Sequence, residues 1–368
     1  MSEETRLKHR SPATKLTRSI LIILALGFLV SVGISIWAYV VYHNKTQTVI
    51  KQELQNITKD GAESIQEVLI KAMHRTDAIA QHLTDGILTE RECLEKIKEL
   101  VSKHDNYYGS AIAYRPYGYD PSKRLYAPYY RKSNKNSGFT HFEYIDYDYT
   151  DTAIYQWFSD AINGGDGWGE PYWGPVAQTT ILTYSSVFYE VDSITKKQKP
   201  LGVVTVDISL NHLKTIIDNM NLGTSGFGAL ISKDGVYMYH PKTEYVSNGK
   251  TILDIAEEEN DNDRRILAEK SKNGESGIMD HISATTDDNS FLVYAPVELT
   301  GWSLHNTFIR EDIKIEVDVI RTKLIRIVVW SLLFVLFLCM SIYAKYATNW
   351  KVEWCIPSAK SELLRVKI

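Results

Sequence analysis

Two long uncharged, apolar segments limit what this chain can fold into more than any other feature of its sequence. Residues 19–42 form a run of 24 residues without a charge, and residues 327–344 form a second run of 18. Because an α-helix rises about 1.5 Å per residue, these runs would be about 36 Å and 27 Å long, close to the thickness of the hydrocarbon core of a bilayer. The sequence therefore predicts two membrane-spanning helices.

The distribution of charge predicts the orientation of these helices. Five basic residues precede the first span against two acidic ones, and the second is flanked by Arg326 and Lys345, so both termini are expected in the cytoplasm. Residues 43–325 would then lie outside, with 41 acidic and 30 basic residues, a balance that argues against nucleic acid as a partner. A cleaved signal peptide is the alternative for the first run, which is longer than a usual signal core and lacks a small-x-small cleavage site.

The segment between the spans is predicted to fold into helices followed by strands. Apolar residues recur every three to four positions over residues 43–82, and no proline occurs between Ala13 and Arg115, which predicts a long helix that continues from the first span. Beyond residue 107 the pattern changes to strands, predicted at 110–114, 124–131 and 139–146.

The three cysteines predict no disulfide. One lies outside the predicted membrane, one within it and one in the cytoplasm, so no two can pair within the chain.

The stretch from Tyr155 to Asp207 carries the candidate binding site. It reads as a short helix, an aromatic loop that we expect to be rigid, and two alternating strands, the second of which ends on an acid after a buried apolar run. Aromatic walls around one carboxylate suit a small polar or cationic guest. The alternative is that Asp207 caps the following helix or pairs with a core residue. The candidate ligand-binding residues are Tyr129, Tyr155, Trp157, Phe158, Trp168, Tyr172, Tyr184 and Asp207.

Other kinds of chemistry have little support in the sequence. The sequence contains no G-x-S-x-G, no P-loop and no G-x-G-x-x-G after a predicted strand, so no enzyme and no cofactor is predicted. The acid-rich segments at 146–151 and 259–263 lack the spacing of a calcium loop. His240, His281 and His305 stand singly on predicted strands, which is more typical of surface or core histidines than of metal ligands, and no metal site is predicted.

Four sequence patterns in the candidate-site stretch resemble those of a known family. These are W-F at 157–158, W-G-E-P-Y at 168–172, T-Y-S at 183–185 and G-V-V-T-V-D-I-S-L at 202–210. In this order they resemble the membrane-distal half of the double-Cache extracytoplasmic sensor domains of bacterial and archaeal transmembrane receptors and histidine kinases, whose modules are PAS-like. The resemblance covers roughly residues 43–310.

This resemblance implies an α+β fold with two membrane-spanning helices flanking a double PAS-like ectodomain, which has a long N-terminal spine helix and two antiparallel sheets. The expected organisation is a cytoplasmic tail at 1–18, a first span at 19–42, spine and connecting helices at 43–106, a distal Cache module at 107–220, a proximal module at 221–310, an exit helix at 311–326, a second span at 327–344 and a cytoplasmic tail at 345–368.

The resemblance also bears on the ligand. Family members that bind amino acids carry R-x-W-Y on the pocket helix, where the Arg holds the ligand carboxylate and a strand Asp takes its ammonium group. Trp157, Tyr172 and Asp207 match this pattern, whereas Tyr155 stands in place of the Arg and Phe158 in place of the Tyr. Since a bidentate carboxylate partner is lost, an amine, a cation or a neutral polar metabolite is favoured over a free amino acid.

The combined prediction is a two-pass sensor of the cell membrane, a homodimer in contact with lipid, whose small-molecule ligand shifts helices that enter the membrane. The 24 residues after the second span are too few for a kinase domain, so the sequence predicts either a membrane or cytoplasmic signalling partner or a truncated relative of a larger chemoreceptor or histidine kinase. The alternative from another class is an extracytoplasmic interaction or scaffold subunit of a membrane complex.

Overall fold

The computed structural model of this chain describes residues 12–132, 139–142, 147–283 and 285–354. It contains two compact units, one made of Met1–Ile50 and Ile313–Ile368 and the other of Lys51–Asp312. The strand predicted over 139–146 and the tail predicted at 345–368 extend partly beyond the described residues.

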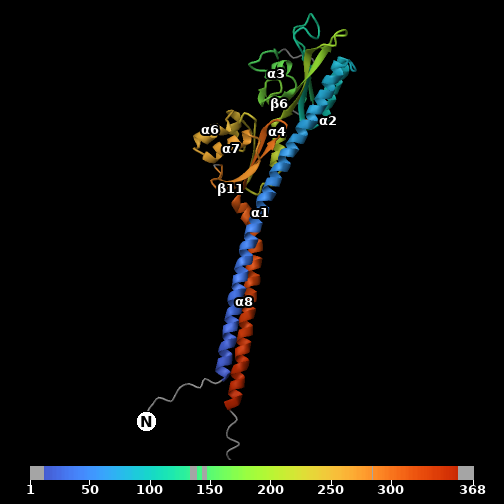
Figure 1. Cartoon of the computed structure of the whole chain (residues 1–368). Coiled ribbons are helices and arrows are strands. Elements are labelled where there is room, and N and C mark those ends of the chain that lie inside the picture. Colours follow the sequence, from blue (N-terminus) through green and yellow to red (C-terminus); the bar gives the residue numbers. More distant parts are fainter. Residues whose placement is uncertain (1–11, 133–138, 143–146, 284, 355–368) are drawn as a thin grey trace, which may run out of the picture. The chain divides into compact units, whose positions relative to one another are not determined.

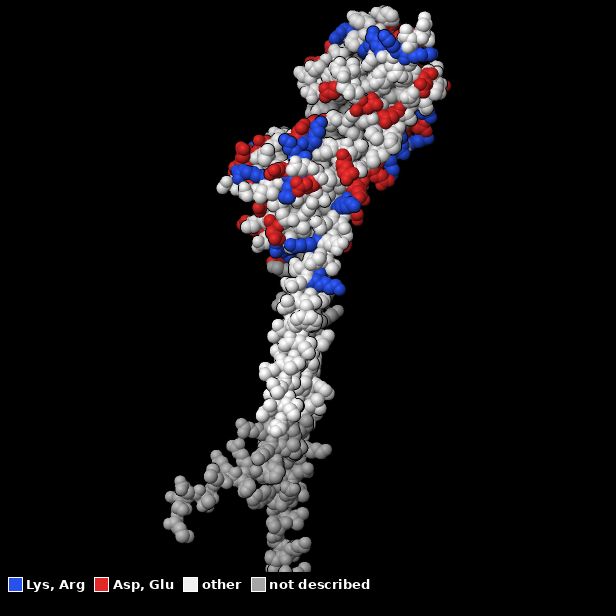
Figure 2. All heavy atoms as spheres, viewed as in Figure 1, with Lys and Arg blue, Asp and Glu red and all other residues white. Residues whose placement is uncertain are grey.

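The first unit contains two helical segments, which belong to α1 (Pro12–Thr84) and α8 (Arg310–Trp354). Their described side chains are largely apolar and exposed, and Figure 2 shows a mostly uncharged surface over the described residues of this unit. An apolar groove between them is lined by residues such as Tyr39 and Val328.

One helix among the described residues is long and apolar enough to cross a membrane, within Ala25–Thr84, and α8 contains a shorter apolar stretch, Ile325–Leu338. The first predicted span is thus consistent with the structure, and the two-pass topology remains a prediction.

The second unit contains a seven-stranded sheet and a five-stranded sheet, both antiparallel (Figure 1). The first sheet has the order β3-β2-β1-β7-β6-β4, with β5 also paired to β6. Its strands are β1 (Tyr107–Tyr114), β2 (Tyr129–Lys132), β3 (Phe139–Phe142), β4 (Gly167–Trp168), β5 (Tyr172–Gly174), β6 (Thr179–Val191) and β7 (Gln198–Ser209). The second sheet has the order β10-β11-β12-β8-β9. Its strands are β8 (Phe227–Ile231), β9 (Tyr237–Tyr239), β10 (Gly277–Ile282), β11 (Asn289–Val297) and β12 (Trp302–Ile309).

The two faces of the seven-stranded sheet have different environments. One face packs on α1 and α2 (Glu90–Lys103) through aliphatic residues such as Ile65, Ile97 and Val206. The other face packs on α3 (Gln156–Gly164) through an aromatic cluster that includes Tyr149, Trp157 and Phe158. Figure 1 shows α2 and α3 on opposite sides of β6. Because side chains alternate along a strand, neighbouring residues of β6 and β7 reach these two environments in turn.

The remaining helices flank the second sheet or connect the two sheets. They are α4 (Leu210–Asp218), α5 (Thr243–Ser247), α6 (Ile252–Glu258) and α7 (Asn262–Lys272). Ser209 caps α4, because its hydroxyl accepts a hydrogen bond from the Asn211 amide. The long N-terminal helix and the two antiparallel sheets are confirmed.

Two local predictions were wrong, and one helix was missed. Residues 124–128 precede β2 and do not extend it. Pro128 has no amide hydrogen, and the Tyr126 amide donates to the Tyr149 hydroxyl at 3.1 Å. This segment therefore accepts hydrogen bonds from β1 but donates none to it. The loop predicted as rigid at 168–173 contains the short strands β4 and β5, which pair with β6. Helix α5 was not anticipated.

Candidate functional site

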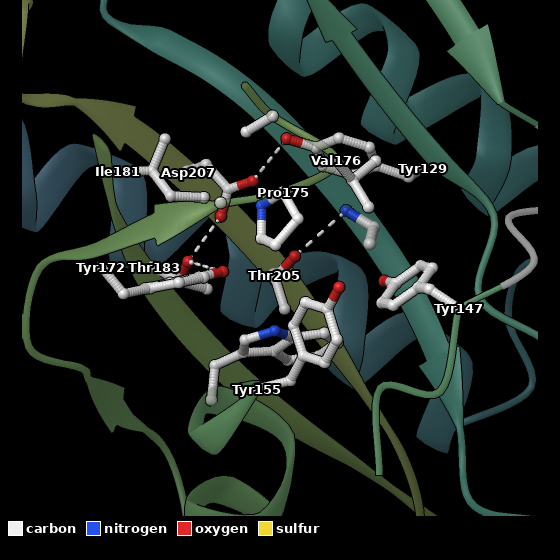
Figure 3. Close-up of a pocket in the computed structure, with 14 residues that line it drawn as sticks. Tyr129, Tyr147, Tyr155, Tyr172, Pro175, Val176, Ile181, Thr183, Thr205 and Asp207 are labelled. Carbon is white, nitrogen blue, oxygen red and sulfur yellow. Dashed lines mark hydrogen bonds between the residues drawn. The ribbon is translucent and has the colours of Figure 1, made fainter. Parts of the chain in front are cut away.

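The seven-stranded sheet carries a small pocket on the face that packs against α3 (Figure 3). Its floor is formed by β7 and β6, and its walls come from β2, β5, the start of α3 and the turn between β5 and β6. The lining residues are Ala111, Tyr129, Tyr147, Tyr155, Trp157, Tyr172, Gly174, Pro175, Val176, Ala177, Ile181, Thr183, Thr205 and Asp207.

Asp207 is the only charged residue in the described lining of this pocket. Its side chain is buried, with 3% of the residue exposed. The Thr183 hydroxyl donates to Oδ1 at 2.7 Å, and the Tyr129 hydroxyl donates to Oδ2 at 2.7 Å. An ionised carboxylate offers about four acceptor positions, so two remain for a further donor.

Burial governs the ionisation of this carboxyl. Loss of solvation raises the pKa of Asp207 to about 6, against the opposing effect of the hydrogen bonds from Thr183 and Tyr129. Burial, followed by the proximity of Asp207, also raises the pKa of the Tyr172 hydroxyl far above its usual value, so that this group stays protonated. At neutral pH the pocket therefore holds a negative charge among hydroxyl groups that can donate or accept hydrogen bonds.

Tyr129 reaches Asp207 because of a glycine on the strand between them. Strand β1 separates β2 from β7, and Gly109 of β1 pairs with Asp207. A Cβ atom at Gly109 would lie 2.2 Å from the Tyr129 hydroxyl and 2.6 Å from its Cζ. The missing side chain thus leaves the space through which the Tyr129 ring crosses β1.

A second layer of hydrogen bonds positions the floor. The Tyr172 hydroxyl and the Thr183 hydroxyl are 3.2 Å apart, and Thr205 accepts from the Ala111 amide at 3.1 Å. Figure 3 shows both contacts, with Tyr147 and Tyr155 on the other side of the pocket from Asp207. The rings of Tyr147 and Tyr155 are 4.9 Å apart.

The turn between β5 and β6 closes the pocket. The Gln178 amide donates to the Gly174 carbonyl at 2.6 Å, and the Tyr108 hydroxyl donates to the Ala177 carbonyl at 2.7 Å. Figure 3 shows Pro175 and Val176 of this turn beside Asp207 and Tyr129. The cavity that remains is about 30 Å³, which is enough for one or two water molecules.

The structure brings together five of the eight candidate residues of the sequence analysis, namely Tyr129, Tyr155, Trp157, Tyr172 and Asp207. The other three lie elsewhere. Phe158 packs against Tyr149 and Trp157 in the aromatic cluster behind the pocket. Tyr184 and Trp168 contact each other away from the pocket lining, and the Tyr184 hydroxyl bonds to Asp77 of α1.

Sequence reasoning missed several lining residues, among them Tyr147, Thr183 and the turn Pro175–Ala177. The alternation of β6 placed Thr183 and Tyr184 on opposite faces, but it did not indicate which face was the pocket. Tyr147 belongs to a tyrosine-rich segment in which no local pattern distinguishes one ring from another.

A separate cluster of possible metal ligands lies beside the five-stranded sheet. Asp261, Asp263 and His281 come together although the sequence suggested an isolated histidine. The two nitrogens of His281 face different carboxylates, Nδ1 at 3.5 Å from Asp263 and Nε2 at 4.0 Å from Asp261. The Arg264 guanidinium lies 3.6 Å from Asp261. These contacts fit an ion-pair network better than a converging metal site.

Comparison with known proteins relates this chain to methyl-accepting chemotaxis proteins. Residues 94–215 match a family model described as methyl-accepting chemotaxis protein-like, first PDC sensor domain. The chain is 28% identical over 144 residues to the methyl-accepting chemotaxis protein PctB of Pseudomonas aeruginosa, covering 36% of this chain and 22% of that protein. It is 25% identical over 167 residues to McpC of Bacillus subtilis, covering 44% and 21%. The matched part thus spans about a fifth of these relatives.

Solved structures agree in fold. The extracellular domain of a candidate histidine kinase, soHK1S-Z6, superposes with a TM-score of 0.59 at 20% identity, covering 75% of this chain and 99% of that domain. The periplasmic sensory domain of the Campylobacter jejuni chemoreceptor Tlp1 superposes with a TM-score of 0.58 at 14% identity, covering 72% and 97%.

Proposed function

We propose that this chain, which carries a double-Cache, PAS-like ectodomain related to the sensor domains of chemoreceptors and histidine kinases, is the sensing part of a membrane receptor for a small molecule with a protonated amino group. The ligand would bind in the pocket of the seven-stranded sheet, with its ammonium group on Asp207. Non-enzymatic ligand binding is the role of the sensor domains to which the chain is related.

The observation that carries this proposal is an uncompensated buried carboxylate. Asp207 accepts hydrogen bonds from two hydroxyls, yet the described lining of its pocket contains no Lys, Arg or His. Burying a charge without a counter-charge is costly, so such a site is expected to be completed by a cation. An ammonium group offers three donors and a positive charge, and the Trp157 ring adds a surface suited to cations.

The size of the cavity adds a mechanical requirement. A space of about 30 Å³ is too small for an organic amine, so the turn Pro175–Ala177 must move outward before the ligand enters and close after it. The bond from the Tyr108 hydroxyl to the Ala177 carbonyl joins this turn to β1. Closure of the turn over the ligand would complete the wall of the pocket and exclude water from Asp207.

The proposal places the ectodomain outside the cell, between two spans, in a homodimer. The charge distribution along the sequence supports this topology, and the exposed apolar surface of α1 supports insertion in a membrane. Figure 2 shows both signs of charge interspersed over the second unit, as expected for a surface in water.

Ligand titration of the full chain in detergent micelles tests the proposal. A panel of small amines, their hydroxyl analogues, free amino acids and dicarboxylates is followed by calorimetry at pH 7.5. We expect amines to bind, hydroxyl analogues to bind poorly, and Asp207→Asn to weaken amine binding at least 30-fold, because removing one partner of a buried charge pair costs about 2 kcal/mol or more of binding free energy.

The matched control is Asp160→Asn, which removes an exposed carboxylate from α3 in the same module and should leave the affinity unchanged. Tight binding of a dicarboxylate, or equal amine affinity in Asp207→Asn and the unsubstituted chain, would refute the assignment of an ammonium site.

A further inference from the structure

Strand β6 connects the pocket to the opposite face of the sheet through two consecutive residues. Thr183 contacts Asp207 and Tyr172 inside the pocket. Tyr184 follows it and points to the other face, where only 4% of it is exposed. Because the pleat fixes these side chains to one backbone, a movement of Thr183 is also a movement of Tyr184.

Tyr184 has a defined partner on the spine helix. Its hydroxyl donates to Oδ1 of Asp77 at 2.8 Å, a bond between β6 and α1 that spans 107 positions of the sequence. Burial is the main cause that raises the pKa of Tyr184 far above its usual value, and the bond to Asp77 adds to it, so the hydroxyl keeps the proton that it donates. A hydrogen bond between a neutral hydroxyl and a carboxylate is among the stronger kinds in proteins.

Tyr184 also contacts Trp168, a residue that reaches the five-stranded sheet. Its ring lies 5.3 Å from Trp168 of β4, and Trp168 lies 6.4 Å from Trp302, the first residue of β12. Trp168 is only four positions before Tyr172, which lines the pocket. The side chain of Glu170, between them, interacts with Ser232 beyond the end of β8. The segment 168–172 therefore touches the pocket at one end and the five-stranded sheet at the other.

The spine helix is bonded to both sheets. In addition to the Asp77 contact, Asn306 of β12 donates to Thr58 at 3.1 Å in a buried position, and the Leu299 amide donates to Gln66 at 3.0 Å. Thr58 and Asp77 are 19 residues apart, or about 28 Å along the helix. Movement of α1 against one sheet thus strains its bonds to the other.

We infer that Tyr184 is the coupling residue that joins the state of the Asp207 pocket to the position of α1, with Trp168 as its contact to the five-stranded sheet. The role of this coupling in signalling rests on the proposed function, but the coupling itself is a property of the unliganded protein. Tyr184 acts through Thr183 and Asp77 and does not touch the ligand.

The test is hydrogen–deuterium exchange of the full chain in detergent micelles without any ligand. Asp207→Asn perturbs the pocket, and exchange is measured in peptides covering residues 70–84 of α1, with α7 as the internal reference for global stability. We expect Asp207→Asn to change exchange in residues 70–84 about fivefold relative to α7, the effect of about one net hydrogen bond. In the Tyr184→Phe background this difference should disappear.

The matched control is Tyr126→Phe, which removes a tyrosine–carboxylate bond to Glu90 of α2 in the same module. In this background the effect of Asp207→Asn on α1 should persist. If Tyr184→Phe does not fold, Asp77→Ala removes the same bond from the helix side and is interpreted identically.

Two results would overturn the inference. One is an unchanged effect of Asp207→Asn on residues 70–84 in the Tyr184→Phe or Asp77→Ala background. The other is no effect of Asp207→Asn on α1 in the unsubstituted chain. Neither depends on whether amines bind, so failure of the coupling and failure of the ligand assignment are separate outcomes.

Discussion

Replacing Asp207 by asparagine is expected to stabilise the unliganded protein at neutral pH while it removes the proposed ammonium site. The pKa of this carboxyl is raised to about 6 in the folded protein, from 3.8 in the absence of burial. The folded state therefore holds its proton more tightly than the unfolded state. As the pH rises through this window, the folded protein must ionise a buried group, and the free energy of unfolding decreases.

The magnitude follows from the two pKa values. A difference of about 2 units corresponds to about 3 kcal/mol of lost stability once the pH is well above 6. At pH 4 most of this penalty is absent, because the folded protein still carries the proton. Asparagine has no such titration, so the stability of Asp207→Asn relative to the unsubstituted chain should rise by about 2 kcal/mol between pH 4 and pH 8.

Thermal melts of both proteins in detergent micelles, followed by intrinsic tryptophan fluorescence from pH 4 to pH 8, measure this difference. For a unit of this size, about 2 kcal/mol corresponds to a shift of roughly 5 °C in the difference between the two midpoints. The contributions of other titrating groups to the pH dependence cancel in this difference, because both proteins contain them. A midpoint difference that is constant with pH, or that moves in favour of the unsubstituted chain as the pH rises, would refute the claim that Asp207 is a strained buried charge.

Two further predictions concern glycines at which a side chain would meet a neighbour. Gly109→Ala should displace the Tyr129 ring, cost about 1–3 kcal/mol and weaken amine binding in the calorimetric assay, and unchanged affinity would contradict the role of Tyr129. Gly202→Ala would place a Cβ 2.4 Å from the Ala113 backbone oxygen and 2.4 Å from Phe188. Its melting midpoint should fall further than that of Gly109→Ala, because the backbone of β1 cannot rotate away as a side chain can. A smaller decrease would show that the strands separate easily.

Local chemistry was sufficient for most of the secondary structure. Apolar spacing and the absence of proline predicted the long α1, and alternation predicted β6 and β7. These features depend on neighbouring residues, which a sequence displays directly. The failed strand at 124–128 depended on Tyr149, a residue distant in sequence that takes the place of a strand partner.

The candidate site was only partly predictable. An acid at the end of an apolar strand stands out in any sequence, and Asp207 lies in the pocket with Tyr172 and Trp157 as its aromatic surroundings. Alternation separates Thr183 from Tyr184, but it cannot tell which face of a sheet receives a helix and which receives a cavity. The larger aromatic residue was assigned to the pocket, whereas it contacts α1.

The sequence alone determined the periodicities and the position of one carboxylate behind a run of buried residues, because these follow from the side chains of adjacent positions. Only the tertiary structure decided that Tyr129 crosses β1 at Gly109 to reach Asp207, and that Tyr184 bonds to Asp77. Such contacts join residues about 80 to 110 positions apart. They arise when strand order and helix packing select one face for each residue, a choice made by the burial of the whole chain and not by any local segment.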